Sequence, residues 1–570
     1  MAIQITGPVA LVPPAVSSAA KDGGRSRRSK ATWLVLLGWL AQVVLRVWTS
    51  WHAHAPAAFP DEAGYLLAAR RLAGGPGGDM SYSTFYQGGY PLLLSPVYWV
   101  TADPTTAYRL VLMIGAVIGA AVFPLSLAIS RRLGLRPATA FGIAFAVALL
   151  PANVFFGAWA LADAILPAIV ACWLLALMRF ADTGGRLAGS VASLAAAYAY
   201  AVHARGTVIL LVHAGVLGFL LVRGWVPRRR TMVGIGVAAV GYVGASRLNA
   251  LLLHAMWPDG SLDLSAVLWS RLTSADGLLR TLSGACGQVW YLIVATYGLA
   301  GLGLVATVAR LLSPRADRSL RLVAAAAIAV TAGIALATTA ALPDEHRIGN
   351  YAYGRYLACV AIPLSLAGAG TLVRAGRRTM ITAVPATVGV LAGAALAVTT
   401  YAGPRLHEYT FIGFDFPETS YLTGNWRSLD MLTAGLVAGA LFGGMILLRR
   451  LPILVVALLL LVNGGFILHT RATFVRPAGD LRHALSGKGG VEVARDLRWW
   501  TVMKLRYRVG WTTVGWLNSA APRAQTCTVL TAWPGGAASS TWPGHPDGWT
   551  VADQKPSQWV AWRRESCAAR

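Results

Sequence analysis

The sequence contains very little charge. Only 13% of its 570 residues are Asp, Glu, Lys or Arg, whereas 56% are hydrophobic and the mean hydropathy is +0.57. Soluble globular domains carry about 25% charged residues. The composition therefore excludes an ordinary soluble domain and predicts an integral membrane protein.

Acidic residues are the scarcer class of charge. The chain has 23 Asp and Glu against 49 Lys and Arg, which gives a net charge of +26. A basic chain binds nucleic acid when its basic residues share one soluble face, but here they form short clusters between apolar segments. We therefore expect no nucleic-acid partner, and we interpret the basic clusters as signals of membrane topology.

Cysteine is also rare, with five residues in the chain. Cys172, Cys286 and Cys359 lie in or beside apolar segments and lack the spacing of metal ligands. Cys527 and Cys567 belong to the C-terminal hundred residues, where they could form a disulfide if that region faces an oxidising compartment. Their spacing alone does not establish contact between the two sulfur atoms.

Long apolar stretches are abundant. A membrane-spanning helix needs about 20 mostly apolar residues, and thirteen stretches are predicted to span. The first follows a basic run at 21–30 and is expected to be an uncleaved span rather than a signal peptide. The predicted spans are residues 31–49, 106–130, 137–154, 158–178, 187–203, 207–223, 231–252, 283–310, 319–341, 356–373, 379–401, 430–448 and 451–469.

The basic residues predict the orientation of these spans, because cytoplasmic loops hold the excess of Lys and Arg. A cytoplasmic N-terminus places every large basic cluster between spans on the cytoplasmic side. Only three of the 23 acids, Asp22, Asp182 and Asp317, then lie inside, and the other 20 (23 minus 3) lie outside. We expect a multi-pass plasma-membrane protein whose acidic outer surface carries its chemistry.

These patterns predict an all-α polytopic membrane protein with about 13 transmembrane helices and a small C-terminal extracytoplasmic α/β domain. The expected parts are a cytoplasmic tail at 1–30, a transmembrane domain at 31–470 with a long first outer loop at 50–105, and the outer domain at 471–570. In the outer domain, "KGGVEVARDL", "CTVLTAWPG" and "SQWVAWRR" read as short strands or as a strand and a helix. The outer domain contains nine of the 21 tryptophans of the protein. We expect them to build a small core or to lie at the membrane surface rather than to form a sugar-stacking platform.

The first outer loop contains "AFPDEAGYLLAARRLAGG". It predicts a helix along the outer surface whose Arg70 and Arg71 face water or headgroups. Asp61 is expected to cap the start of this helix and Glu62 to complement its positive end, which is compatible with a catalytic role. A second surface helix is expected at Pro91–Val100.

Several arginines lie near the predicted outer ends of helices, although Lys and Arg are usually concentrated on the cytoplasmic side. Any one of them could extend to the headgroups, but together they could hold a lipid phosphate. Asp163, near the outer end of the fourth predicted span, is either paired with an arginine in a structural role or functional. The arginines in question are Arg46, Arg109, Arg205, Arg247 and Arg355, and "ALPDEHRIGNYAYGRYLACV" adds His346, Arg347 and Tyr356.

The sequence resembles the GT-C superfamily of membrane glycosyltransferases that use polyprenyl-phosphate sugars, which includes aminoarabinose transferases of lipid A and protein O-mannosyltransferases. The resemblance is carried by "PDEAGYLLAARRL", "LLPANVFFGAWALADAILP" and "YGRYLACVAIPL". It implies that Asp61 is the catalytic carboxylate with Glu62 beside it, and that an acid matched by Asp163 lies near the outer face. Basic and tyrosine side chains are implied to bind the donor phosphate and substrate, and those matched or adjacent here are Arg205, His346, Arg347, Arg355 and Tyr356.

The predicted function is transfer of a sugar, with inversion, from a polyprenyl-phosphate donor to a hydroxyl of a cell-envelope glycan, lipid or protein. Mannosyl and arabinosyl transfer both remain open. No metal ligands are assigned, and Mg or Mn held by Asp61, Glu62 and another acid is a variant of the mechanism. The alternatives are a polyprenyl-lipid transporter or flippase and a non-catalytic scaffold. The sequence shows neither an internal repeat nor charges at mid-membrane, which transporters tend to have.

Overall fold

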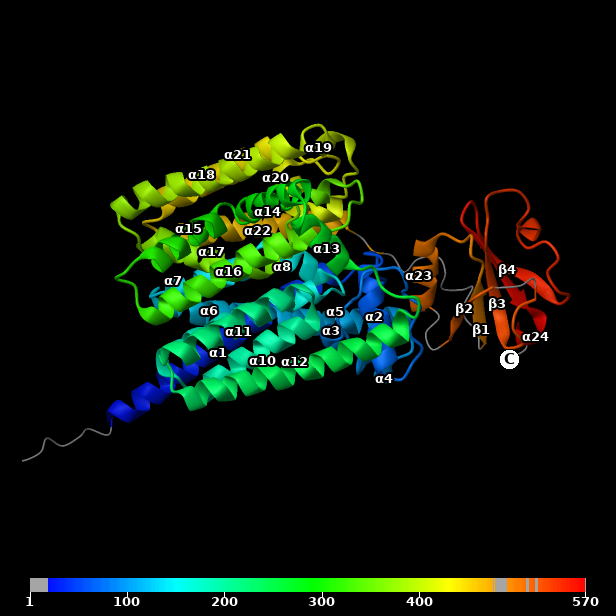
Figure 1. The fold of residues 1–570 in the computed structure, drawn as a ribbon, viewed down its shortest axis with the longest axis horizontal. Helices are drawn as coiled ribbons and strands as arrows, with labels where there is room; N and C mark the ends of the chain where they lie inside the picture. The colour runs from blue at the N-terminus through cyan, green and yellow to red at the C-terminus, as the bar shows by residue number, and fades with distance from the viewer. Residues whose placement is uncertain (1–18, 475, 477–488, 509–511, 518–520, 569–570) are drawn as a thin grey trace, which may run out of the picture.

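The computed structural model describes residues 19–474, 476, 489–508, 512–517 and 521–568. Figure 1 shows long helices, from α1 (Ala19–Ser50) to α22 (Pro452–Thr473), that run side by side as a bundle, with a sheet beyond one end of it. We call that end, which carries α2 (Asp61–Leu72) and α4 (Val97–Val100), the site end. Of the predicted tail, residues 1–18 lie outside the described residues.

The chain is a multi-pass membrane protein. Among the described residues, 11 helices are long and apolar enough to cross a membrane, or up to 12 if a bent pair of helices counts as one span. The bent pair is Pro137–Ala148 with Pro151–Ala158. The 11 are Lys30–Ser50, Pro104–Arg132, Leu166–Thr183, Arg205–Arg223, Arg228–Met256, Ala275–Ala295, Arg318–Ala341, Arg355–Arg374, Arg377–Ala402, Met431–Leu448 and Pro452–Thr473.

Two of the thirteen expected spans are not among the 11. The expected span at 137–154 falls on the bent pair of helices. The predicted span at 187–203 is α10 (Arg186–Val202), a helix of 17 residues. The predicted span at 283–310 counts once among the 11 but is divided into two helices, α14 (Ala275–Ala295) and the shorter α15 (Leu299–Leu312). Tyr297 and Gly298 lie between them with φ angles of 54° and 82°. These left-handed conformations cannot continue an α-helix, and hydropathy alone does not reveal them.

The segment after α1 forms three short helices at the site end. They are α2, α3 (Gly89–Leu94) and α4, so the second predicted surface helix is divided at Ser95 and Pro96. Asp61 is the first residue of α2 but does not cap it, because Pro60 holds the cap position and no side chain caps this end. The prediction that Arg70 faces water was wrong: its side chain is buried and donates to carbonyl oxygens, including Arg506 O at 2.7 Å.

The described C-terminal strands form one mixed sheet in the order β2-β1-β3-β5-β4. The β1 strand pairs in parallel with β2 and β3, whereas β5 pairs antiparallel with β3 and β4. The three sequence stretches expected to form secondary structure contain β1, β5 and all but the first residue of β3. The strands are β1 (Gly490–Val493), β2 (Val514–Trp516), β3 (Thr526–Ala532), β4 (Trp549–Lys555) and β5 (Trp559–Arg564).

Tryptophans fill one face of this sheet. Trp542, Trp549 and Trp562 are all buried and pack edge to face, with ring centroids 5.2 Å apart for Trp542 and Trp549. The expectation of a small tryptophan core is confirmed for these three residues. A buried core leaves none of these three rings free for stacking on a sugar.

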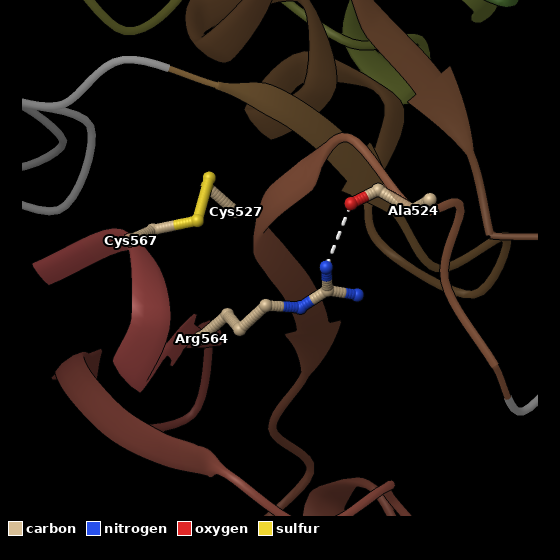
Figure 2. The surroundings of a disulfide bond; sticks show 4 residues. All are labelled: Ala524, Cys527, Arg564 and Cys567. Atoms are coloured by element: carbon tan, nitrogen blue, oxygen red, sulfur yellow. Dashed lines mark hydrogen bonds between the residues drawn. A yellow bond between two sulfur atoms is a disulfide. The ribbon is translucent and has the colours of Figure 1, made fainter.

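Cys527 and Cys567 form a disulfide. It joins β3 to the short helix α24 (Glu565–Ala568) that follows β5, as Figure 2 shows. Beside it, Arg564 donates a hydrogen bond of 2.7 Å to the carbonyl oxygen of Ala524. The pairing that sequence spacing left open is therefore made.

The helix α23 (Trp499–Arg508) connects the sheet to the bundle. It packs on α2, and Arg70 of α2 donates to the carbonyl oxygens of Arg506 and Tyr507. The hydroxyl of Tyr507 donates to Pro104 O at the start of α5 (Pro104–Ala120). The site end of the bundle is thus in direct contact with the C-terminal part of the chain.

Candidate active site

Four predicted side chains form one chain of ion pairs at the site end. Arg355 Nη1 lies 2.5 Å from Asp61 Oδ2, and Arg355 Nε lies 2.9 Å from Asp163 Oδ2. The other oxygen of Asp163 lies 2.6 Å from Arg205 Nη2. The residues come from four segments that are far apart in sequence, so the fold brings together what the sequence only placed on one side of the membrane.

Each of the four ion-paired residues lies at or just before the beginning of a helix. Asp61 opens α2 and Arg205 opens α11 (Arg205–Arg223), while Arg355 lies in the 3-10 turn that leads into α17 (Ala358–Arg374). Asp163 lies in a short 3-10 turn before α9 (Leu166–Thr183). Because helix beginnings carry partial positive charge, carboxylates are favoured there.

The side chains become more exposed from Arg205 to Asp61 along the series of ion pairs. The exposed fraction of the side chain is 1% for Arg205, 3% for Asp163, 8% for Arg355 and 30% for Asp61. Of the two carboxylates in this series of ion pairs, Asp61 is therefore the one that an incoming molecule can reach.

A tyrosine fixes the orientation of Asp61. The hydroxyl of Tyr86 donates a hydrogen bond of 2.9 Å to Asp61 Oδ1. Burial raises the pKa of Tyr86 well above its usual value, and the neighbouring Asp61 raises it further, so the phenol stays protonated. Gly64 allows this contact, because a Cβ there would lie 2.1 Å from the Tyr86 ring.

Asp163 is ionised although it is buried. Burial alone raises the pKa of a carboxyl group, but here the charges of Arg205 and Arg355 outweigh it and hold the pKa of Asp163 below its usual value. A buried carboxylate between two guanidinium groups is a rigid support for both. This is the paired role that the sequence left open for Asp163.

Arg205, which the sequence predicts to bind the donor phosphate, makes its described contacts within the protein. Its Nη1 donates to the carbonyl oxygens of Arg355 and Tyr356, at 2.9 and 3.2 Å, and its Nη2 to Asp163. Its Nε donates to His203 Nδ1 at 3.3 Å. Burial and the charge of Arg205 lower the pKa of His203 well below its usual value, so this imidazole is a neutral acceptor. Four donors of Arg205 are therefore occupied within the protein.

Glu62 occupies a separate, fully buried network. Its Oε2 accepts from the backbone amides of Ala57 and Ala58, at 2.8 and 2.9 Å. Its Oε1 accepts from Tyr108 Oη at 2.6 Å and from the amide of Ala160 at 2.8 Å. With 0% of its surface exposed, Glu62 holds the entry to α2 in place rather than sharing a surface with Asp61.

These contacts also bear on the Mg or Mn variant. Within the described residues, no group of three or more His, Cys, Asp or Glu side chains could hold a metal ion. Both oxygens of Glu62 already accept two hydrogen bonds, and Asp61 is paired with Arg355. The arrangement of Asp61, Glu62 and a third acid is not formed, and we derive no step through a metal.

Three further residues predicted to bind substrate lie in the segment that leads into α17. Tyr356 packs its ring on Tyr353, with centroids 4.7 Å apart, and lies under the Arg205 guanidinium. Arg347 lies over the ring of Tyr353, whose hydroxyl is 3.5 Å from Arg355 Nη1. His346 is exposed and contacts Tyr409 instead. The structure thus links Arg347 and Tyr356 to the ion-pair chain through Tyr353, and it does not place His346 there.

The remaining arginines lie in other surroundings. Arg46 is buried and donates to the backbone carbonyls of Ala148 and Asn153, at the break in the bent pair of helices. Arg109 and Arg247 are exposed, and Arg109 lies 2.6 Å from His54 Nδ1. None of the three makes a described contact with Asp61, Asp163 or Arg355.

Sequence reasoning missed two charged residues near the site. Arg476 donates to Tyr108 Oη at 2.8 Å and to Ala158 O at 2.6 Å, beside Glu62. Asp415 is 3% exposed, and the charges of Arg347, Arg355 and Asp61 act on it. The signal for Asp415 was present in "FIGFDFPETS", where an acid is flanked by phenylalanines.

No protein-family profile matches the sequence, and comparison with characterised protein sequences finds no match. Solved structures do match. ArnT from Cupriavidus metallidurans bound to undecaprenyl phosphate aligns with a TM-score of 0.55 and 14% identity, over 94% of this chain and 98% of that chain. The same protein in the apo state aligns with a TM-score of 0.53 and 13% identity, over 94% and 99% of the two chains. The described chain therefore has the fold of ArnT, and the fold expected from the GT-C resemblance is confirmed.

Proposed function

We propose that this protein is a membrane glycosyltransferase that moves a sugar from a polyprenyl phosphate to a hydroxyl of a cell-envelope acceptor. The observation that carries the proposal is the partly exposed Asp61 carboxylate, which is held by Tyr86 and Arg355 at the end of the bundle. The ArnT fold supports it, because one of the two matching ArnT structures is bound to undecaprenyl phosphate.

We further propose that the site end faces the outside of the plasma membrane. The basic clusters at the ends of several helices support this orientation. Arg132 pairs with Asp182, Arg230 donates to Gly184 O, Arg374 to Leu133 O and Arg449 to Ala375 O. The basic segments after α6 (Val122–Arg132), α9, α17 and α21 (Met431–Leu448) therefore lie close together. Basic loops are retained on the cytoplasmic side.

The reaction we propose is a single displacement. The acceptor oxygen forms a bond to the anomeric carbon while the bond from that carbon to the phosphate oxygen breaks. The electron pair of the broken bond leaves with the polyprenyl phosphate, and the acceptor proton passes to an oxygen of Asp61. A general base of this kind contributes about 100- to 10,000-fold to the rate, and the configuration of the sugar is inverted.

Arg355 is our candidate for the group that meets the phosphate. It is the guanidinium nearest to Asp61, and Asp163 fixes its Nε. The phosphodiester anion of the donor competes with Asp61 for Nη1, because guanidinium groups bind phosphate and carboxylate oxygens in the same way, and the negative charge of this phosphate increases as the sugar leaves it. Donor binding would then release Asp61 as a base. Arg205 and Asp163 position Arg355 in this scheme and do not touch the substrate.

A donor screen with the purified protein tests the proposal. Undecaprenyl phosphates carrying radiolabelled mannose, arabinose, glucose or aminoarabinose are offered one at a time together with cell-envelope acceptors. The proposal predicts that label from at least one donor moves into the acceptor fraction. Label that stays in the lipid fraction for every donor, but crosses the bilayer of reconstituted vesicles, would support a transporter instead.

A further inference from the structure

A second acidic and basic pair lies close to Asp61 and Arg355. Arg347 Nη1 lies 3.6 Å from Asp415 Oδ2, and Arg347 Nε lies 2.8 Å from Glu345 Oε2. The segment of Arg347 runs beside that of Asp415, because Ile348 N donates to Thr410 O at 3.0 Å. The pair is therefore fixed by backbone contacts and not only by its side chains.

One polar atom on each residue of this pair lacks a hydrogen-bond partner among the described residues. Asp415 Oδ2 and Arg347 Nε are both buried and have none among the described residues, because neither ion-pair contact is a hydrogen bond. Buried polar atoms in folded proteins almost always have a partner, so Asp415 Oδ2, which accepts no hydrogen bond, calls for a donor, whereas Arg347 Nε already lies 2.8 Å from Glu345 Oε2. A single hydroxyl fits, since it donates one hydrogen bond and accepts others.

The pair is connected to the proposed catalytic residues. The ring of Tyr353 lies under the Arg347 guanidinium, at 5.9 Å, and its hydroxyl lies 3.5 Å from Arg355 Nη1. The charges of Arg355 and Asp61 act on Asp415. One tyrosine therefore separates the Arg347 and Asp415 pair from the Arg355 and Asp61 pair.

Aromatic residues hold Asp415 in place. Phe414 packs against Trp159 with centroids 4.8 Å apart, and Phe416 stacks on Phe411 at 5.2 Å. Gly349 faces the carboxylate, where an added Cβ would lie 3.0 Å from Asp415 Oδ2. The carboxylate thus lies between packed aromatic residues and Gly349, and a larger residue at position 349 would crowd it.

We infer that Asp415 and Arg347 form the subsite that binds hydroxyl groups on the sugar ring of the donor. The inference rests on the proposed glycosyltransferase function and deepens it by assigning sugar recognition. In this subsite Asp415 Oδ2 accepts a hydrogen bond from a ring hydroxyl, and Arg347 donates to the oxygen of the same or a neighbouring hydroxyl. The lipid phosphate meets Arg355 on the other side of Tyr353.

The test compares lipids with and without the sugar. Binding of undecaprenyl phosphate and of undecaprenyl-phosphoryl mannose, arabinose and glucose is measured in detergent, without acceptor, for the wild type, Asp415→Asn and Glu408→Gln. Glu408 is an exposed acid on the same segment and serves as the matched control. Arg347→Gln is the second variant, and the melting temperature shows whether each protein is folded.

We expect the wild type to bind one sugar-bearing lipid more tightly than undecaprenyl phosphate. Asp415→Asn should remove this difference, because a hydrogen bond to a charged group contributes about 10- to 100-fold to affinity. Its affinity for undecaprenyl phosphate should stay within about twofold of the wild type, as should both affinities of Glu408→Gln.

Several results would overturn the inference. One is an Asp415→Asn protein that still prefers the sugar-bearing lipid. Another is an Asp415→Asn protein whose affinities for undecaprenyl phosphate and for the sugar-bearing lipid fall by the same factor. A wild type that binds undecaprenyl phosphate but shows no preference for any sugar would overturn the subsite and leave the proposed function standing. A wild type that binds none of the lipids would overturn the proposed function as well.

Discussion

Arg355 Nη1 lies 2.5 Å from Asp61 Oδ2, although the two residues are 294 positions apart in the sequence. The contact joins the first short helix after α1 to the beginning of α17. Because Asp163 holds the other edge of Arg355, the position of the Asp61 carboxylate depends on three separate segments. The proposed chemistry requires this arrangement.

Removing the charge of Asp163 should destabilise the protein strongly. Asp163→Asn leaves Arg205 and Arg355 without their shared carboxylate, and breaking a buried ion pair costs about 3 to 5 kcal/mol. Asp182→Asn is the matched control, because Asp182 pairs with Arg132 at the surface and exposed pairs contribute less than about 1 kcal/mol. Thermal unfolding in detergent should show a clear fall in Tm for Asp163→Asn only. Equal Tm values for the two variants would contradict the buried role.

Glu62→Gln should lower stability by about 1 to 3 kcal/mol. Each Glu62 oxygen accepts two hydrogen bonds, so an amide nitrogen in either position meets donors and leaves them unpaired. The fall in Tm, compared with wild type in the same detergent, is the measurement. A Glu62→Gln protein with wild-type Tm but no transfer activity would instead favour the direct catalytic role expected from the sequence.

Glu418 should make stability depend on pH. This residue is 2% exposed, and burial raises its pKa to about 7, above the value of about 4.3 in an unfolded chain. The folded protein therefore holds the proton more tightly, so the stabilisation is complete below about pH 4.3 and is lost as the pH rises through about 7. Glu418→Gln should match the wild-type Tm at about pH 4 and exceed it at about pH 8.5.

The control for Glu418 is the exposed Glu408. Glu408→Gln should follow the wild-type Tm at both pH values. If Glu418→Gln also follows the wild type across this range, Glu418 is already ionised in the folded protein and the prediction is wrong.

The disulfide should stabilise the C-terminal sheet. Cys527 and Cys567 are 40 residues apart in the sequence, and closing a loop of this length contributes about 4 kcal/mol in the chain-entropy account. Cys527→Ser should make the sheet region sensitive to trypsin under non-reducing conditions, whereas Cys286→Ala should not. Protease resistance that is unchanged by Cys527→Ser would contradict a stabilising bond.

The fold class could be predicted from sequence because it follows from composition and long apolar stretches. The divisions within those stretches could not, because they depend on single backbone conformations. Tyr297 and Gly298 end one helix and begin another through positive φ angles, and hydropathy barely changes there. The tryptophan core of the C-terminal sheet followed from composition, whereas the order of its strands did not.

The site was predictable in part. The acid at the start of α2 and the arginine before α17 were found, because charges beside apolar stretches stand out. Their direct contact was not predictable, since it depends on the tertiary fold. The competing roles of Asp61 and Glu62 were also hidden, because adjacent residues of a helix point about 100° apart and only the packing decides which one is buried.

The measurement that tests the central claim most directly is sugar transfer by Asp61→Asn. The control is Asp259→Asn, an exposed acid in the loop after α12 (Arg228–Met256). We predict that Asp61→Asn keeps a Tm close to that of the wild type and loses about 100- to 10,000-fold in transfer rate with the donor that the wild type uses, while Asp259→Asn keeps the wild-type rate. A transfer rate within about threefold of wild type for Asp61→Asn would contradict the account.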